Sequence, residues 1–306
     1  MKWTWVIADI HGEWDKLQAV LEKMRSAGFD LADPEQTLVQ LGDRNDRGDD
    51  SYKVIEWFKT QQIMFPGQVI CLLGNHDRMM IDAAEGRSDL MYWNGGYRTA
   101  RSYMHVINNG THHGNSYFAR FFPSAMRASG HLDWLKTLPK YYETSEYFFS
   151  HAPIPKEEFR TIPIGLDFRQ DEQTLTWSYI DERTERWVDP NLVPIEEDGN
   201  FYGKYKTCVY GHIHGIRYAP DPQVPAVRTV VVPGPRVHGH AILMDTGAGC
   251  HPDGYVSCLR MEDRVVFTSK GDSFSLDEHV RIEQEAARER AKRELREQLY
   301  GGQEDT

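Results

Sequence analysis

The residues that point most directly to chemistry are two aspartates and an arginine, Asp43, Asp46 and Arg47. They lie within residues 42–48, which read Gly-Asp-Arg-Asn-Asp-Arg-Gly. Neighbouring carboxylates repel one another, and charges withdrawn from water need partners of opposite sign. A metal ion would neutralise the carboxylates, and a bound phosphate group would pair with Arg47. An ordinary charged surface turn is the alternative, because glycine, aspartate and asparagine are common turn residues.

Two further motifs carry the same kinds of side chain. Residues 9–12 (Asp-Ile-His-Gly) contain Asp9 and His11, and residues 74–77 (Gly-Asn-His-Asp) contain Asn75 and His76. Carboxylate, amide and imidazole groups supply the oxygen and nitrogen donors that divalent metal ions take. Three such motifs in order along one chain are much harder to obtain by chance than one, so together they favour a metal site over surface turns.

The elements around these motifs predict that they meet in space. Each motif follows a mostly apolar run typical of a strand, and a helical pattern comes after it. The strand-like runs are residues 3–8, 37–41 and 69–73. Alternating strands and helices predict an α/β sheet, in which ligands bind beyond the carboxyl ends of the strands. We therefore expect the three motifs to form one site.

The three motifs resemble the DxHG, GDxxDRG and GNH[D/E] motifs of the phosphoprotein phosphatase family, within the calcineurin-like metallophosphoesterases. Later segments extend the resemblance, because residues 148–152 and 208–214 end strand-like runs in histidines. Residues 241–260 resemble the closing strands of bacterial and phage members, including diadenosine tetraphosphate hydrolases. The resemblance covers about residues 3–268, nearly the whole chain, and its motifs are highly specific.

The resemblance implies an α/β fold, the metallophosphoesterase four-layer α/β/β/α sandwich with two mixed sheets. It predicts a catalytic domain over residues 1–270, with a cap or insert at about residues 88–140. Residues 105–130 are rich in Asn, Gly, His and aromatic residues without a clean period, which indicates a cap or loop near the site. Residues 275–306 are predicted to form a highly charged C-terminal helix and tail.

The resemblance also implies two divalent metal ions with a defined set of ligands. The residues at matching positions are Asp9, His11, Asp43, Asn75, His151 and His212. Asp43 would bridge the two ions. Mixed nitrogen and oxygen ligands suit manganese, which we expect, and also iron, zinc or nickel. His214 stays open, because the wider superfamily uses both histidines of a GHxH motif as ligands, whereas phosphoprotein phosphatases usually have a non-ligating residue there.

The catalytic roles follow from the same resemblance. Arg47 would bind phosphate oxygens with its planar fork of donors, a geometry that lysine cannot reproduce. His76 would protonate the leaving oxygen, with Asp46 fixing its tautomer, and the alternative is that His76 only orients Asn75. Asn75 would also contact the substrate.

One expected phosphate ligand has no clear counterpart. Phosphatases of the phage lambda type carry a Trp-x-Arg segment whose arginine binds phosphate. The nearest stretch here is residues 177–179, Trp-Ser-Tyr, so that Tyr179 takes the arginine position. A phenol donates one neutral hydrogen bond, which predicts weaker phosphate binding or a different substrate. Arg183, one turn further along an expected helix, is a candidate substitute.

Two substrate classes stay open. The first hypothesis is a phosphomonoesterase of the serine/threonine protein phosphatase type, supported by Asp46, since bacterial diadenosine tetraphosphate hydrolases often lack an aspartate there. The alternative is a nucleotide-directed hydrolase that cuts symmetrical dinucleoside polyphosphates, capped RNA or cyclic phosphates. It is favoured by the closing-strand resemblance and by an insert able to stack a base. A non-enzymatic binding module would require a missing ligand, and every shared metal position is filled.

The bulk composition limits the partners. A net charge of −11 over 306 residues argues against general binding to nucleic acids or membrane surfaces, which needs a broad basic face. A phosphorylated protein or a small phosphoester is the expected substrate, and a monomer or weak dimer is the expected state. The four cysteines show no CxxC spacing, which predicts reduced thiols. The N-terminal apolar run is too short for a signal peptide, so a cytoplasmic location is expected.

Overall fold

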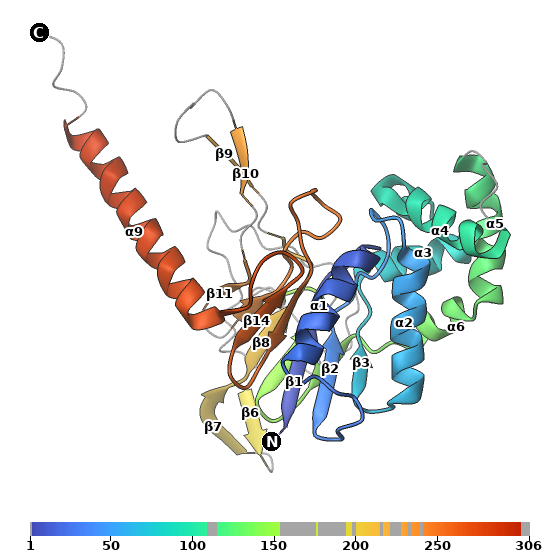
Figure 1. Cartoon of the computed structure of the whole chain (residues 1–306), viewed down its shortest axis with the longest axis horizontal. Helices are drawn as coiled ribbons and strands as arrows, with labels where there is room; N and C mark the ends of the chain where they lie inside the picture. Colours follow the sequence, from blue (N-terminus) through green and yellow to red (C-terminus); the bar gives the residue numbers. More distant parts are fainter. Residues whose placement is uncertain are drawn as a thin grey trace, which may run out of the picture.

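The computed structural model describes residues 2–108, 115–153, 176, 194–197, 200–214, 217–220, 228–231, 234–238 and 241–300. Two mixed sheets and a set of helices dominate this part of the chain (Figure 1). Neither sheet is continuous in sequence. Each combines strands from the first and the second half of the chain, so the site depends on contacts between distant segments.

The first sheet has six strands in the order β15-β14-β13-β1-β2-β3. Its strands are β1 (Trp3–Ile7), β2 (Gln36–Gln40), β3 (Val69–Cys71), β13 (Ser257–Arg260), β14 (Val265–Thr268) and β15 (Phe274–Ser275). β1, β2 and β3 run parallel, with Trp5 opposite Leu38 and Leu38 opposite Val69, while β13 pairs antiparallel with β1. The predicted parallel core of three strands is therefore confirmed, and its carboxyl ends lie at one edge.

The second sheet has five strands in the order β11-β12-β8-β5-β4. They are β4 (Tyr141–Glu143), β5 (Tyr147–Ser150), β8 (Thr207–Tyr210), β11 (Arg236–His238) and β12 (Ala241–Leu243). β5, β8 and β12 run parallel, and β4 and β11 pair antiparallel at the two edges. Two small ribbons complete the strands: β6 (Pro194–Glu197) with β7 (Asn200–Tyr205), and β9 (Arg217–Pro220) with β10 (Arg228–Val231).

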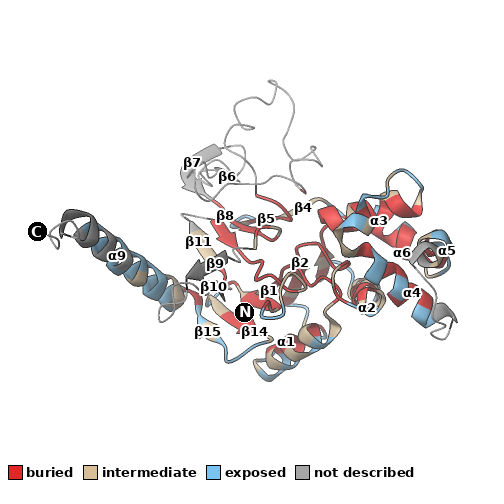
Figure 2. Ribbon diagram, turned by 90° about the horizontal axis from the view of Figure 1, so that it is seen from above, coloured by how far each residue is buried: buried red, intermediate tan, exposed pale blue. Residues whose placement is uncertain are grey.

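Alternating side chains of β1 divide the interior into two cores. Trp5 and Ile7 pack in a cluster with the helices, whereas Val6 and Ala8 pack in a second cluster with residues of the other sheet such as Val209. Successive residues of a strand point to opposite faces, so a strand with two apolar faces is covered on both sides. Figure 2 shows buried residues (red) concentrated in the strands and on the inner faces of the helices. The expected α/β fold with two mixed sheets and helices is confirmed.

The first two helices lie where the apolar periodicity predicts them. α1 (Trp14–Ser26) buries Leu17, Val20, Leu21 and Met24, and α2 (Ser51–Met64) buries Val54, Ile55 and Phe58. These positions recur at helical spacing, which places an apolar stripe against the sheet. α3 (Asn75–Ala84) begins within the third motif, so Asn75 and His76 lie in its first turn.

The region predicted as a cap or loop is mostly helical. It contains a kinked helical turn η1 (Tyr92–Gly96), then α4 (Tyr97–Asn108), α5 (Asn115–Ala128) and α6 (His131–Lys136). Residues 105–108 and 115–128 are helical, so the loop alternative for residues 105–130 is wrong over these described residues, whereas the cap stays a prediction. The buried residues of α4 and α5 do follow helical spacing, at Ala100, Tyr103 and Met104 and at Phe122, Ala125 and Met126. The Asn, Gly and His residues between them hid that period.

The C-terminal helix α9 (Leu276–Tyr300) extends away from the sheets (Figure 1). Its first turn is anchored, because Leu276 is buried and Val280 packs on the core between the sheets. Further along, Ile282 and Leu295 are exposed. None of the described helices is long and apolar enough to cross a membrane. All four cysteines are free, and Cys71, Cys208 and Cys258 are buried, as predicted.

Candidate metal centre

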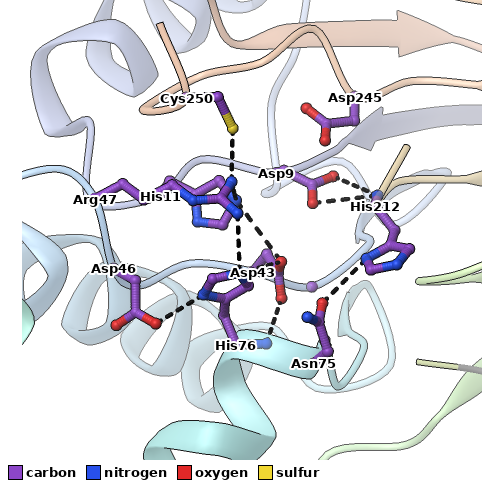
Figure 3. Close-up of polar contacts among 12 residues, drawn as sticks. Asp9, His11, Asp43, Asp46, Arg47, Asn75, His76, His212, Asp245 and Cys250 are labelled. Carbon is purple, nitrogen blue, oxygen red and sulfur yellow. Dashed lines mark hydrogen bonds and ion pairs between the residues drawn. The ribbon is translucent and has the colours of Figure 1, made fainter. Parts of the chain in front are cut away.

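The polar motifs meet at the carboxyl ends of five strands. Asp9 follows β1, Asp43 follows β2, Asn75 follows β3, His151 follows β5 and His212 follows β8. Figure 3 shows most of these side chains pointing toward one another from separate loops and from the start of α3. Parallel neighbours present their carboxyl ends at the same edge, so strand order gathers these residues within each sheet, and the packing of the two sheets brings the two sets together.

The loops that carry the site are strained. His11, Asp43, Asp46, Arg47 and His212 all have positive φ, between 49° and 68°. L-residues rarely adopt this conformation, and such outliers concentrate at functional sites. Gly42 has φ of +114°, and a Cβ atom there would lie 2.7 Å from both the Gly74 Cα and the His151 Nδ1. The close approach of three loops therefore requires glycine at this position.

One group of potential metal ligands comprises His11, Asp43 and His76, whose donor atoms lie within 4.8 Å of one another. The Nδ1–H of His11 donates to the Asn45 carbonyl at 2.8 Å, so the lone pair of Nε2 faces the cluster. That Nε2 lies 3.7 Å from Asp43 Oδ2. A backbone carbonyl that fixes the tautomer of a histidine is the usual support for a metal ligand.

A second group comprises Asp43, His151 and His212, so the two groups share Asp43. His151 Nδ1–H donates to the Leu41 carbonyl at 2.9 Å, and Nε2 lies 3.4 Å from Asp43 Oδ1. Asn75 Oδ1 lies 2.8 Å from His151 Nε2 and 3.1 Å from His212 Nδ1. Asn75 is thus placed among the same donors, and Asp43 has one carboxylate oxygen near each group.

Asp9 and His214 lie beside these groups rather than in them. The carboxylate of Asp9 accepts a hydrogen bond from the backbone N–H of His212, at 3.1 and 3.2 Å to its two oxygens. Burial raises the pKa of Asp9 well above its usual value, and the neighbouring Asp245 adds to that rise. His214 Nδ1 is buried without a hydrogen-bond partner within the part of the chain that the structure describes. The ligand roles of both residues stay predictions.

The electrostatics of the cluster favour neutral His11 and His212 and a protonated His151 around an ionised Asp43 carboxylate. Burial lowers the pKa of His11 well below its ordinary value and lowers that of His212 to about 3. Burial would raise the pKa of Asp43, but the charges of His151, His76 and His11 and the hydrogen bond from His151 together outweigh it, and the pKa of Asp43 falls well below its usual range. Asp43 in turn raises the pKa of His151 to about 9 against the effect of burial. His151 must therefore release a proton when it binds a metal.

Asp46 is held by three side-chain donors and orients His76. His76 Nδ1–H donates to Asp46 Oδ2 at 2.7 Å, while Thr99 and Asn45 donate to Oδ1 at 2.8 and 2.9 Å. Thr99 Oγ1 also accepts the backbone N–H of Asp46 at 2.8 Å. Burial raises the pKa of Asp46, and the hydrogen bond from His76 opposes that rise. Nε2 of His76 is left to face the cluster.

Arg47 also points into the cluster (Figure 3). Its Nη1 donates to His11 Nε2 at 2.7 Å and to Cys250 Sγ at 2.6 Å, and its Nη2 lies 3.1 Å from His76 Nε2. Two glycines allow this arrangement. A Cβ on Gly95 would lie 2.9 Å from the Arg47 backbone nitrogen, and one on Gly249 would lie 2.7 Å from His11 Cβ. The turn η1 and the loop before β13 thus pack directly on the site.

The donor set fits a pair of divalent metal ions. Imidazole and carboxylate donors converge in two groups with a shared carboxylate, which is the arrangement that two neighbouring ions require. The guanidinium of Arg47 contacts the Nε2 atoms of both His11 and His76. A positively charged group is therefore already favourable beside these two imidazole nitrogens. His11, Asp43, Asn75, His151 and His212 would hold the ions. The identity of the metal stays a prediction.

The structure adds residues that the sequence analysis did not single out. Thr99 contacts Asp46 from α4, and no sequence signal marks it. Cys250 contacts Arg47 and was expected only as a reduced thiol. Asp245 follows the buried strand β12, as Asp9 and Asp43 follow β1 and β2, and this pattern was a usable signal. Tyr179 and Arg183, the candidates for a second phosphate ligand, lie outside the described residues.

The protein family whose model matches this chain agrees with the metal centre described above. The family model described as calcineurin-like phosphoesterase matches residues 2–216. No curated protein sequence matches the chain significantly. A cold-active protein-tyrosine phosphatase of Shewanella sp. has a similar structure, with 16% identity, a TM-score of 0.51 and coverage of 90% of this chain and 80% of that chain. At this identity the likeness concerns the fold alone.

Two further solved structures are similar at lower TM-scores. A protein serine/threonine phosphatase from Saccharomyces cerevisiae, with similarity to human phosphatase PP5, has 16% identity, a TM-score of 0.47 and coverage of 90% and 80%. A metallophosphoesterase from Sphaerobacter thermophilus has 16% identity, a TM-score of 0.42 and coverage of 90% and 88%.

Proposed function

The chain belongs to the calcineurin-like phosphoesterase family, and we propose that it hydrolyses phosphomonoesters of aliphatic alcohols, with phosphoserine and phosphothreonine as its first candidate substrates. Membership of the family makes the chain a metal-dependent phosphatase, a hydrolase of phosphoric ester bonds. The finer assignment rests on one observation, the buried hydrogen bond of 2.7 Å between His76 Nδ1 and Asp46 Oδ2.

This pair is what an alkoxide leaving group needs. With Nδ1–H directed at Asp46, the proton that His76 can deliver sits on Nε2, on the side of the ring that faces the cluster. The Asp46 carboxylate stabilises the imidazolium before that transfer. Protonation of the leaving oxygen contributes most when the alcohol is a poor leaving group, as serine and threonine are. An aryl phosphate depends on it less.

The remaining residues bind and orient the phosphate group. Arg47 presents both terminal nitrogens to the cluster and would donate to two phosphate oxygens with one planar fork. Asn75, at the start of α3, would donate from its amide to the substrate or hold an ion. Two bound divalent ions would supply the Lewis acidity that activates water and neutralises charge on the phosphoryl oxygens. Tyr179 or Arg183 would complete phosphate binding.

A manganese-supplemented assay tests this proposal. Its four substrates are p-nitrophenyl phosphate, the bis ester, a phosphothreonine peptide and diadenosine tetraphosphate. We expect metal-dependent hydrolysis of the monoester and the phosphopeptide, with little turnover of the bis ester. Preference for the dinucleotide over the phosphopeptide would overturn the assignment of phosphoserine and phosphothreonine.

A second candidate is a nucleotide-directed hydrolase acting on symmetrical diadenosine tetraphosphate, capped RNA or cyclic phosphates. The observation that favours it is Trp93, whose side chain is 86% exposed although it lies in η1, which packs against Arg47. The turn is anchored, because the rings of Tyr92 and Tyr97 stack at 5.0 Å. An exposed indole on an anchored turn suits stacking of a base.

Trp93→Ala separates the two candidates. If the chain is a nucleotide-directed hydrolase, this substitution should lower kcat/KM for diadenosine tetraphosphate by roughly tenfold, since stacking on an aromatic side chain is worth about 1–3 kcal/mol per base. If the chain is a phosphoprotein phosphatase, the phosphothreonine peptide is the better substrate of the unsubstituted chain. Trp93→Ala should leave the hydrolysis of p-nitrophenyl phosphate unchanged under either hypothesis.

The working conditions are also part of the proposal. Manganese is the metal that we propose, because the ligands mix imidazole, amide and carboxylate donors. We propose a cytoplasmic enzyme that acts as a monomer or weak dimer on a phosphorylated protein or small phosphoester. The net charge of −11 supports a substrate bound locally at the metal centre rather than over a basic surface.

A further inference from the structure

Asn45 is a fully buried residue at the centre of the second motif, between Asp43 and Asp46. Its backbone carbonyl accepts the Nδ1–H of His11 at 2.8 Å, and so supports a proposed metal ligand. Its side-chain amide has other partners, which are the two members of the acid pair, Asp46 and His76. The main chain and the side chain of this residue therefore serve different parts of the site.

The amide nitrogen of Asn45 connects the two members of the acid pair. Nδ2 donates to Asp46 Oδ1 at 2.9 Å and to the backbone carbonyl of His76 at 3.1 Å. Both partners are acceptors, so the network determines which end of the amide faces them. The hydrogen bond of 2.7 Å between His76 Nδ1 and Asp46 Oδ2 joins the same two residues (Figure 3). Asn45, Asp46 and His76 thus form a closed hydrogen-bonded ring.

The other end of the amide has no partner. Oδ1 of Asn45 is buried and receives no hydrogen bond from any of the residues that the structure describes. An unpaired buried acceptor costs stability, and its presence in a folded protein calls for a reason other than stability. Leucine has nearly the same shape and would avoid that cost. The contribution that an amide makes here comes from its nitrogen, whose hydrogen bonds both go to the acid pair.

The acid pair needs support because its loop is strained. Asp46 and Arg47 have φ of 68° and 64°, in the left-handed region that L-residues rarely adopt. A strained loop relaxes unless its neighbours hold it, and relaxation would move the Asp46 carboxylate away from His76. Thr99 holds that carboxylate from α4. Asn45 holds it from within the loop and also binds the His76 carbonyl at the start of α3.

We propose that Asn45 is a positioning residue for proton donation, because its amide fixes the Asp46 carboxylate relative to the His76 backbone and so directs Nε2 of His76 at the leaving oxygen. The inference rests on the proposed role of His76 as the acid in phosphomonoester hydrolysis, and it names a residue on which that role depends. Asn45 acts through these two residues and not on the substrate. Its carbonyl supports His11 whatever its side chain is, so substitution separates the two contributions.

Asn45→Leu tests the proposal, because leucine keeps the shape of the side chain without its donor. The substitution should lower kcat for a phosphothreonine peptide by roughly tenfold, which corresponds to about 1.4 kcal/mol in the barrier. The loss for p-nitrophenyl phosphate should be much smaller, since its leaving group depends little on protonation. KM for the peptide and the affinity for Mn²⁺ in calorimetric titration should stay close to their original values, because Arg47 and the Asn45 carbonyl are unaltered.

Gln36→Met is the matched control. Gln36 is also a buried amide, but both of its polar atoms are paired, at the start of β2. Its Oε1 accepts from Trp5 Nε1 at 3.0 Å, and its Nε2 donates to the Gly28 carbonyl at 2.9 Å. Gln36→Met leaves these partners unpaired, so it should lower the urea midpoint more than Asn45→Leu does. Any effect of Gln36→Met on the two substrates should be equal.

A double-mutant cycle shows whether Asn45 acts through Asp46. In an Asp46→Asn background, Asn45→Leu should cause little further loss of kcat for the peptide, because the carboxylate that the amide positions is already gone. Asn45→Ala removes the same amide without filling its space and gives the same comparison if leucine prevents folding. A full additional loss in the Asp46→Asn background, or equal losses for the two substrates in the single variant, would overturn the proposal.

A spectroscopic measurement separates this inference from the proposed function. In Zn²⁺-loaded protein with isotopically labelled histidine, the His76 Nδ1 proton should give a downfield NMR signal that is absent in His76→Asn. We expect this proton to exchange faster with water in Asn45→Leu and at its original rate in Gln36→Met. That result supports the positioning role of Asn45 even if the phosphothreonine peptide is not hydrolysed, an outcome that contradicts the proposed function alone. An unchanged exchange rate in Asn45→Leu refutes the positioning role.

Discussion

Breaking the buried ion pair between Arg44 and Asp77 should weaken the fold and the metal centre together. Both side chains are fully buried, and Arg44 Nη1 donates to Asp77 Oδ2 at 2.7 Å. The same oxygen accepts the backbone N–H groups of Asp43 at 3.1 Å and Gly74 at 2.9 Å. Arg44 Nη2 donates to the Leu72 carbonyl at 2.7 Å. The pair therefore ties the second motif to the third.

The expected magnitude follows from burial. Arg44→Met leaves the Asp77 carboxylate buried without its counter-charge, which costs about 3–5 kcal/mol of unfolding free energy. Asp77→Asn keeps the shape but removes the charge opposite Arg44, at a similar cost. Arg44→Met/Asp77→Asn removes both charges, so the two losses should not add, and the double variant should be less destabilised than their sum by about 2 kcal/mol.

Urea unfolding in EDTA measures these losses, and calorimetric titration with Mn²⁺ measures metal binding. We expect metal affinity to fall in the single variants, because Asp77 positions the Asp43 backbone. Arg281→Met is the control, since Arg281 forms exposed pairs on α9 and its loss should cost under about 1 kcal/mol. Additive losses in the double variant, or unchanged metal affinity in Arg44→Met, would refute the reasoning.

Three further predictions concern the acid, its support and a distant buried histidine. His76→Asn should lower kcat for a phosphothreonine peptide far more than for p-nitrophenyl phosphate, and equal losses in steady-state assays would count against the proton-donor role. Thr99→Val should lower kcat for the peptide by roughly tenfold through loss of both buried hydrogen bonds between the Thr99 hydroxyl and Asp46, with metal content unchanged by atomic emission and with activity kept in Thr99→Ser. Burial lowers the pKa of His131 to about 4, and the hydrogen bond to Glu56 opposes that fall. Since the unfolded chain binds this proton more tightly, stability should decline as pH falls from about 6.5 to 4, and His131→Asn should flatten that slope in urea titrations.

The sequence contained enough information for the central strands and their motifs. The runs before Asp9, Asp43 and Asn75 are mostly apolar, as strands covered on both faces are, and a polar motif follows each one. Strand order then brings these motifs together without further information. The helices α1 and α2 were predicted for the same reason, because their buried residues recur at a single clear period.

Residues 97–128 show where the local pattern was insufficient. The buried faces of α4 and α5 are helical, but α4 packs on α5 and α2, and α5 packs on α4, α6 and α3. The buried stripe of α4 is broken by polar residues such as Thr99 that have partners elsewhere. Thr99 contacts Asp46 across more than fifty residues, and composition gives no sign of that contact. Only the packing of α4 against the second motif reveals its role.

The sequence determined which donor atoms this protein possesses and the order in which strands deliver them. Tertiary structure decided which donors meet: Asp43 is shared between two groups, Asp9 turns its carboxylate to the His212 backbone, and Cys250 contacts Arg47. The reason is physical, since a strand pattern records how a segment is buried, whereas contacts between loops depend on how two sheets and a set of helices pack.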